Sequence, residues 1–338
     1  MKLFLKILII CNSIFSSDDR LKIIQADVMQ SFTKENNSIT ELQGNVILQK
    51  ENLFLYTSKA INYPDLKIFK LAGPVTMVNN VDTLKSDNML YYNKYPDYLL
   101  ATGNVTYKKP GQFLKCDSLY YWTDIDSGYA IGSVKLNNDN HSINTDYINY
   151  KQTNGPKGLS FSAYKNVSIF DNKRLIKTDT LSYNDNSEIM YLKNGGIIKE
   201  EKRGLSGDKI SIQYEDTLIK KIDIYKNAQA WDDIERKISA NDIAMYKFRN
   251  EMKSKHISMN FKENKIQRMN LFNMSETKYH IAEDSLLMGI NHTSGDTIII
   301  SFEDNKLSKI QVIGGGEGKF VPEENNAKVD TTINYKSN

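Results

Sequence analysis

Residues 98–122 read YLLATGNVTYKKPGQFLKCDSLYYW, and this stretch decides the fold. Its first half alternates apolar and polar side chains around Val105 and Tyr107, as a half-buried strand does. Lysines, a proline and a glycine at positions 108–111 predict a turn, after which a second segment rich in aromatic residues reaches Trp122. The stretch therefore predicts two strands joined by a turn.

The same unit recurs along the chain. Gly-x-Val motifs begin at Gly44, Gly73, Gly103 and Gly132, so that successive copies lie 29, 30 and 29 residues apart. Degenerate copies follow at Lys165-Asn166-Val167, Gly195-Gly196-Ile197 and Lys226-Asn227-Ala228. A fixed period of this length indicates stacked repeats in which each unit mainly contacts its neighbours. The 338 residues therefore predict one elongated stack rather than separate globular domains.

A second motif lies between the glycine motifs and has an acidic or polar residue at its centre. The centres are Asp27, Lys59, Asp87, Asp117, Asp146, Asp179, Asp208 and Asp242. The residue directly before each centre is small or polar, and the residue three positions before it is mostly apolar. The residue two positions after the centre is apolar, and the residue four positions after it is mostly tyrosine. A strand can change its buried face in this way only at a bulge, bend or corner. We expect each centre to mark a corner between two short strands, with the carboxylate capping turn amides. A metal-binding or catalytic row is disfavoured because Lys59 interrupts it.

The apolar columns of the repeat supply the candidate interior. Six of the 20 tyrosines fall in one column, namely Tyr63, Tyr91, Tyr121, Tyr150, Tyr183 and Tyr246. Buried valine, leucine and isoleucine fill protein cores by default, whereas the tyrosine hydroxyl favours a groove rim because it needs water or a partner. Core filling and groove lining both stay open. The candidate groove residues are Val75, Met89, Tyr91, Val105, Leu119, Tyr121, Val134, Ile148, Tyr150, Val167, Leu181 and Tyr183.

Composition excludes several classes of protein. The 44 basic and 41 acidic residues nearly balance, so net charge offers no reason to expect nucleic-acid binding. The four histidines, His141, His256, His280 and His292, have no metal-ligand spacing, and no nucleophile elbow or phosphate loop occurs. We therefore expect no catalytic residue, no metal and no cofactor. Two cysteines exclude a disulfide scaffold, and no apolar run reaches the roughly 20 residues of a membrane-spanning helix.

The two ends of the chain differ from the repeats. Residues 1–17 combine Lys2, a short apolar stretch and a Ser16-Ser17 exit, which predicts a secretory signal peptide. Bulky Ile9 and Ile10 argue against lipid attachment at Cys11. Residues 18–235 hold the repeats, residues 236–321 a less regular continuation or a second jellyroll, and residues 322–338 a polar, flexible tail. In the less regular part, Gly295-Asp296 and the strand pattern after it echo Gly207-Asp208, 88 residues earlier.

The motifs Leu42 to Val46, Ala101 to Val105 and Ser206 to Ile210 resemble those of the organic-solvent-tolerance (OstA-like) family, which includes LptA. The resemblance covers residues 24–244 and returns at residues 295–322. It implies an all-β, elongated jellyroll of two sheets, built from stacked two-strand repeats of about 30 residues. The family's apolar groove holds lipid acyl chains, and its members stack edge to edge.

The resemblance also implies a function. The chain is expected to be a non-enzymatic periplasmic protein that shields the acyl chains of lipopolysaccharide between the inner and outer membranes. Its expected partners are lipopolysaccharide (lipid A), other jellyroll proteins of the export bridge paired through edge strands, and further copies of itself head to tail. The alternative is a parallel β-solenoid that acts as a cell-surface adhesin or processes polysaccharide.

Overall fold

The structure is a computed structural model that describes residues 20–35, 37–94, 96–122, 127–138, 141–152, 159–171, 173–215, 218–303 and 306–323. The expected signal peptide at residues 1–17 lies outside the described residues, as does the expected tail from residue 324 onward. Within the described ranges all regular structure is β, which confirms the predicted all-β fold of two-strand repeats.

The chain divides into two compact units. Unit 1 comprises residues 1–172 with 182–186, and unit 2 comprises residues 173–181 with 187–338, so that the two units share β12 (Arg174–Asn184). The other strands of unit 1 are β1 (Lys22–Gln25), β2 (Val28–Lys34), β3 (Asn37–Lys50), β4 (Leu53–Tyr63), β5 (Ile68–Asn79), β6 (Asp82–Tyr92), β7 (Tyr98–Lys109), β8 (Gln112–Trp122), β9 (Ser127–Asn138), β10 (His141–Gln152) and β11 (Leu159–Asp171). The other strands of unit 2 are β13 (Ile189–Glu200), β14 (Arg203–Glu215), β15 (Leu218–Arg236), β16 (Tyr246–Lys262), β17 (Lys265–Glu283), β18 (Leu286–Glu303), β19 (Lys306–Ile313) and β20 (Glu317–Pro322). Pro322, the first residue of the expected tail, thus ends a strand. The expected boundary at residue 235 stays a prediction.

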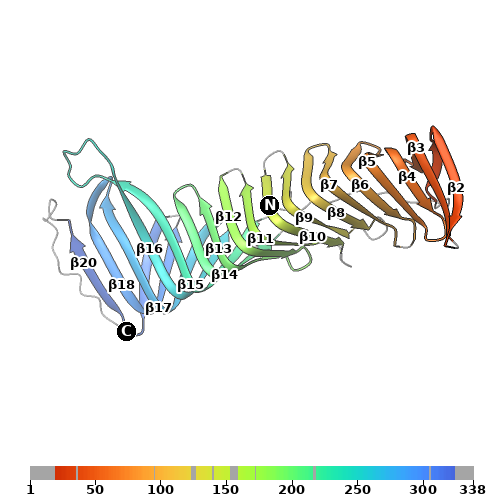
Figure 1. The fold of residues 1–338 in the computed structure, drawn as a ribbon. Coiled ribbons are helices and arrows are strands. Elements are labelled where there is room, and N and C mark those ends of the chain that lie inside the picture. Colours follow the sequence, from red (N-terminus) through yellow and green to blue (C-terminus); the bar gives the residue numbers. More distant parts are fainter. Residues whose placement is uncertain are drawn as a thin grey trace. The chain divides into compact units, whose positions relative to one another are not determined.

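Strands that are consecutive in the chain pair side by side in both units (Figure 1). From β3 to β11 in unit 1, and from β13 to β18 in unit 2, each strand pairs antiparallel with the next. At the outer ends two short strands share one neighbour: β1 and β2 both pair with β3, and β19 and β20 both pair with β18. These named pairs are all antiparallel, so the alternative of a parallel β-solenoid is wrong.

Each long strand changes its buried face near its middle, as the sequence predicts. In β6, Leu84 and Ser86 are buried, Asp87 and Asn88 are exposed, and Met89 and Tyr91 are buried again. The register with β5 shifts at the same place, between Ala72 and Val75. A repeat is therefore two long strands that are each bent at a bulge, rather than two short strands separated by a corner.

The two sequence motifs are the two sides of one corner. Gly103 and Asn104 both have positive φ (76° and 46°), and the Asn104 side chain donates a hydrogen bond to Asp87 Oδ2 on the neighbouring strand at 2.9 Å. A Cβ on Gly103 would lie 2.5 Å from the same carboxylate oxygen, so glycine makes room for the aspartate. Equivalent bonds join Asn45 to Asp27, Asn166 to Asp146, Asn194 to Asp179 and Asn227 to Asp208. These carboxylates accept side-chain amides of the bulge, which corrects the expectation that they cap turn amides.

Two of the predicted corner centres are wrong. In β4 the buried residues are Leu55, Thr57 and Ala60, which places the corner at Ser58 rather than at Lys59. Ser58 Oγ is 2.5 Å from the position of a Cβ on Gly73, in the slot that aspartate fills elsewhere. The row of corner residues therefore contains the Ser58 hydroxyl, and Lys59 does not interrupt it. Tyr63 consequently lies one residue outside the tyrosine column.

Asp242 marks no corner. It lies in the connection between β15 and β16, where its carboxylate accepts the backbone amides of Ile238 and Ser239 at 3.1 and 2.8 Å. Tyr246, assigned to the tyrosine column, is accordingly 43% exposed. The register with β15 places Lys255 at the corner of β16. The next aspartate at a corner is Asp296 in β18, whose amide donates to Gly314 O at 2.8 Å, as the amide of Asp27 donates to Gly44 O at 2.9 Å. An aspartate that caps a loop and one that fills a corner look alike in sequence.

Candidate functional site

The candidate site is the interior of unit 1, which lies between two layers of strand halves. Layer A consists of the halves next to the turns at residues 51–52, 80–81 and 110–111. Layer B consists of the halves next to the connections at residues 64–67 and 93–97. Side chains from both layers line one small cavity: Tyr107, Leu114 and Leu136 of layer A, and Leu119, Ile148 and Tyr150 of layer B. The two layers therefore face each other across the corners.

The twelve predicted groove residues are all buried. None is more than 4% exposed, and Val105 and Leu181 are fully buried. Eleven belong to unit 1, whereas Leu181 belongs to unit 2. The valines stand beside the corners in layer A, and the remaining residues of unit 1 line layer B. Their burial fits both interpretations of these columns, core filling and groove lining.

Small residues between the predicted ones complete layer B, and the sequence analysis missed them. Along one row of register partners, Met89, Leu119 and Ile148 alternate with Ala101, Ala130 and Ala163. The facing row of layer A is large throughout: Leu84, Tyr107, Leu114, Leu136 and Ile143. Alternating large and small side chains lets facing layers interdigitate. The alanines share the glycine motif's period, a signal that could have identified them.

Gly128 plays a similar part in the tyrosine row. It is the register partner of both Tyr121 and Tyr150, whose rings stack with centroids 6.5 Å apart. A Cβ on Gly128 would lie 3.2 Å from Tyr150 Cε1 and 2.6 Å from the Tyr120 carbonyl oxygen. A glycine is therefore needed where the two rings meet.

The interior is closed in this conformation. The cavity between the layers measures about 20 Å³, which is room for about one water molecule. An acyl chain could enter only if the two layers moved apart. The corners are the natural hinge, because the backbone bends there and the Asn–Asp bonds lie at the corners themselves.

A buried ion pair joins the tips of the two layers. Lys50, at the end of layer A in β3, places Nζ 2.6 Å from Oδ2 of Asp97, which precedes β7 in layer B. The Tyr91 hydroxyl donates to the same oxygen at 3.1 Å. Lys50 is 3% exposed and Asp97 6% exposed. Neither charged residue is among those predicted from the sequence, although Lys50 continues the alternation of Val46 and Leu48.

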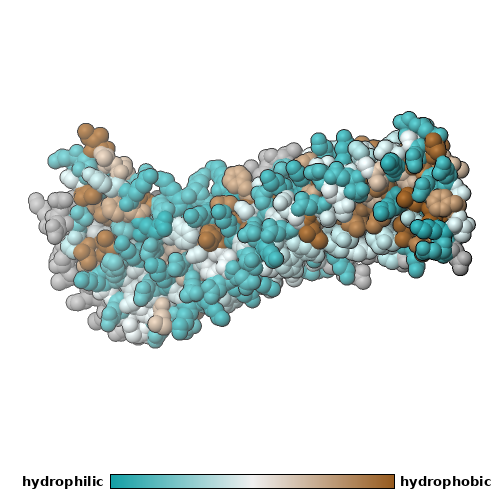
Figure 2. Space-filling view, in the orientation of Figure 1, coloured by the Kyte–Doolittle hydropathy of each residue, from teal (hydrophilic) through white to brown (hydrophobic). Residues whose placement is uncertain are grey.

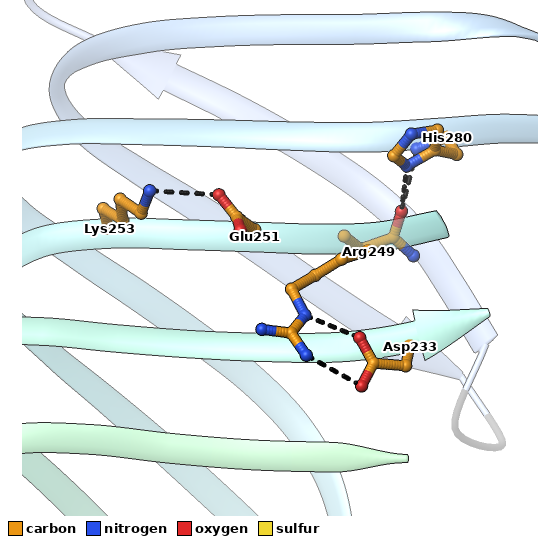
Figure 3. Close-up of polar contacts among 6 residues, drawn as sticks. Asp233, Arg249, Glu251, Lys253 and His280 are labelled. Atoms are coloured by element: carbon orange, nitrogen blue, oxygen red, sulfur yellow. Dashed lines mark hydrogen bonds and ion pairs between the residues drawn. The ribbon is translucent and has the colours of Figure 1, made fainter. Parts of the chain in front are cut away.

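The interior of unit 2 is different. Between the corners and the β14–β15 turn it is apolar, with Ile210, Ile212, Ile222 and Ile224 buried. The opposite halves of β16, β17 and β18 bury polar groups instead: Asn250, Ser254, Ser275, Thr277, His280, Asn291 and Thr293. His280 donates its backbone amide to Asn250 Oδ1 at 2.8 Å, and burial lowers the pKa of its imidazole. Figure 3 shows this contact beside the exposed pairs Arg249–Asp233 and Lys253–Glu251.

The described residues offer little evidence for a catalytic site. No group of three histidine, cysteine or acidic residues among them could hold a metal ion. Burial raises the pKa of the Cys116 thiol to about 12, so this cysteine is a poor nucleophile. No helix in the described ranges is long and apolar enough to cross a membrane.

Comparisons with known proteins agree with the motifs. Residues 86–228 match the model of the OstA-like protein family. The OstA-like resemblance inferred from the sequence is thereby confirmed for this segment, which is less than half of the chain. No curated protein matches the chain. Among solved structures, the chain is similar to LptH from Pseudomonas aeruginosa, described as the LptA homologous periplasmic component of the conserved lipopolysaccharide transport device. The two share 11% identity and a TM-score of 0.29, over 44% of this chain and 93% of that one.

Proposed function

We propose that unit 1 is a non-enzymatic lipid carrier that shields acyl chains between its two layers. The observation that carries this proposal is the apolar interior, to which both layers contribute large buried side chains between β5 and β10, with Gly128 and Ala130 of β9 as the small partners in layer B. The OstA-like match of residues 86–228 supports lipopolysaccharide as the lipid and the periplasm as the compartment, since both are what the resemblance to that family implies.

The physical gain comes from removing acyl chains from water. Each buried CH₂ group contributes about 0.8 kcal/mol, so a dozen contribute roughly 10 kcal/mol in total. Part of this gain is offset when the layers part and lose their mutual packing. Lipid would thus replace one apolar lining by another, which permits loading and release without chemistry.

Site-specific photo-crosslinking tests this proposal. A photoreactive amino acid at Tyr121, which is 2% exposed and faces the interior, is expected to capture lipopolysaccharide in cells. The same group at Tyr120 is the matched control, because successive strand residues point to opposite faces. Lipid adducts at neither position, or equally at both, would contradict an interior binding site. Mass spectrometry of lipid that co-purifies with the mature protein identifies the native ligand.

We further propose that the β1–β2 end of unit 1 pairs with another jellyroll, either a partner of the export bridge or a second copy head to tail. Four apolar side chains are 43–62% exposed there, namely Ile24, Val28, Met29 and Phe32. Met89, which stands after Asp87 as Met29 stands after Asp27, is only 1% exposed. Figure 2 shows hydrophobic residues at the end of the surface where β2 lies. An open strand edge beside apolar side chains favours β-strand addition.

Light scattering over a range of concentrations tests the edge. Met29→Asp and Phe32→Asp together are expected to abolish self-association, while Met274→Asp in unit 2, at a residue that is 72% exposed, leaves it unchanged. If the wild-type protein stays monomeric at all concentrations, self-association is excluded. Pairing with a different jellyroll protein is then tested by crosslinking at Phe32 in cells.

A further inference from the structure

The buried pair of Lys50 and Asp97 is unusual for its position. Lysine is almost never fully buried unless paired, and the surrounding interior of unit 1 is apolar. Replacing a buried ion pair with apolar residues is often neutral or stabilising, so stability alone gives little reason for this one. Its position suggests another role, because it links layer A to layer B at their tips, on the side opposite the corners.

The pair lies where opening must begin. Parting the layers about the corners moves the tips furthest, so the Nζ–Oδ2 contact of 2.6 Å has to break before the interior can widen. Once the tips separate, water reaches both charges and replaces their mutual attraction. The bond from the Tyr91 hydroxyl, at 3.1 Å, holds Asp97 within layer B meanwhile. An ion pair at a rim is therefore easier to break reversibly than apolar packing of the same area.

We propose that Lys50 and Asp97 form a clasp that keeps the interior closed, and that Lys50 selects amphiphiles whose headgroup carries a phosphate. On opening, the Lys50 ammonium exchanges the Asp97 carboxylate for the phosphate, while the acyl chain enters beside Met89 and Leu119. A neutral headgroup offers Lys50 no anion, and the ammonium then returns to Asp97. The inference rests on the proposed lipid-carrier function and assigns it a gate and a specificity residue.

The amino-acid pattern supplies a matched control. Lys109 ends the alternation Val105, Tyr107, Lys109 in β7 as Lys50 ends Val46, Leu48, Lys50 in β3. Lys109 is only partly buried, whereas Lys50 is 3% exposed. Lys109→Met therefore removes a rim lysine of the same unit without touching the clasp.

The opening rate is measured by stopped-flow uptake of the apolar dye N-phenyl-1-naphthylamine. Asp97→Asn is expected to accelerate uptake at least fivefold, and the charge-swapped variant Lys50→Asp with Asp97→Lys is expected to return it to the wild-type rate. Uptake at one rate by wild type, Asp97→Asn and Lys109→Met would overturn the clasp while leaving the lipid-carrier function intact.

Headgroup selection is measured by displacing the dye with dodecyl phosphate or dodecyl maltoside, which share one acyl chain. Wild type and Lys109→Met are expected to prefer dodecyl phosphate at least fivefold, and Lys50→Met is expected to lose this preference. A preference unchanged in Lys50→Met would overturn the selective role of Lys50.

A measurement without any ligand separates the clasp from the carrier function. Amide hydrogen exchange over residues 46–50 is expected to be faster in Asp97→Asn than in wild type, with no change in unit 2. Failure of all variants to bind dye or dodecyl phosphate would count against the carrier function. Unchanged exchange in Asp97→Asn would count against the clasp.

Discussion

The two units share one strand-and-corner repeat but bury different chemistry. In unit 1 both layers present mainly leucine, isoleucine, tyrosine and valine to the interior. Its buried polar residues include Thr57, Ser86 and Thr145 beside the corners and the ion pair of Lys50 and Asp97 at the rim. In unit 2 one half is apolar around Ile210 and Ile224, whereas the other half buries Asn250, Thr277 and His280. The same backbone can thus support an apolar interior or a hydrogen-bonded one. Among the described residues, unit 1 has the more continuous apolar lining.

Truncating an apolar side chain in the interior of unit 1 is expected to have the largest effect on the free energy of unfolding. Leu119→Ala is expected to lower the free energy of unfolding by about 3 kcal/mol, since it removes buried methyl groups and enlarges the cavity. Each unit holds one of the two tryptophans, Trp122 and Trp231. Urea unfolding of a Trp231→Phe background, followed by Trp122 fluorescence, reports on unit 1. Leu100 faces outward and supplies the control. Leu100→Ala is expected to lower the free energy of unfolding by less than about 1 kcal/mol. Equal losses for both variants would contradict a packed interior.

A polar contact of unit 2 is expected to have the next largest effect. Asn250→Ala leaves the His280 amide, now bonded at 2.8 Å, without its acceptor. Loss of a buried partner costs about 1–3 kcal/mol. Trp231 fluorescence during urea unfolding in a Trp122→Phe background measures it, with the exposed Asn260→Ala on the same strand as control. If Asn250→Ala matched the control, the buried polar half would not contribute to stability.

Two corner glycines allow the cost of a steric clash to be distinguished from the cost of backbone strain. Gly103 in unit 1 (φ 76°) and Gly195 in unit 2 (φ 88°) share a left-handed conformation, but only Gly103 has a carboxylate within 2.5 Å of its missing Cβ. Gly195→Ala is expected to cost about 1 kcal/mol, and Gly103→Ala about 1 kcal/mol more. Removing the carboxylate with Asp87→Ala is expected to abolish the difference. Chemical denaturation of Gly195→Ala, Gly103→Ala, Asp87→Ala and the double variant Gly103→Ala with Asp87→Ala checks this, and equal costs for both glycines would exclude the clash.

The smallest expected effect is a pH dependence in unit 2. Burial lowers the pKa of His280 below its ordinary value of about 6.5. The unfolded chain therefore binds more protons than the folded chain as pH falls below about 6.5, and stability decreases over that range. Urea midpoints of unit 2 between pH 7.5 and 5 are expected to fall with pH, and less steeply in His280→Gln. An identical slope in the variant would assign the dependence to other groups.

Local pattern identified much of the fold. The period of Gly44, Gly73, Gly103 and Gly132 and the change of buried face at Asp87 predicted the repeat and its corner correctly, because alternation along a strand depends on nearby residues alone. They did not predict that each strand continues through the corner. The same locality caused the errors at Lys59 and Asp242. A shift of one residue, or a loop-capping aspartate, leaves almost the same pattern in sequence but a different partner in space.

The candidate site could be predicted only in part. The twelve residues of the apolar columns are buried as a repeat requires, but their burial does not say whether they line a groove. Ala101, Ala130 and Gly128 were missed because small residues become meaningful only opposite a large partner. Lys50 and Asp97 were missed because 47 residues separate them.

By itself, the sequence determined the strand repeat, the corners and the apolar columns, since these follow from side-chain alternation and backbone conformation within each strand. The tertiary structure decided which layers face each other, that Lys50 and Asp97 pair between the layers of unit 1, and that half of unit 2 is polar inside. Those features depend on contacts between distant segments. A one-dimensional period constrains such contacts but does not specify them.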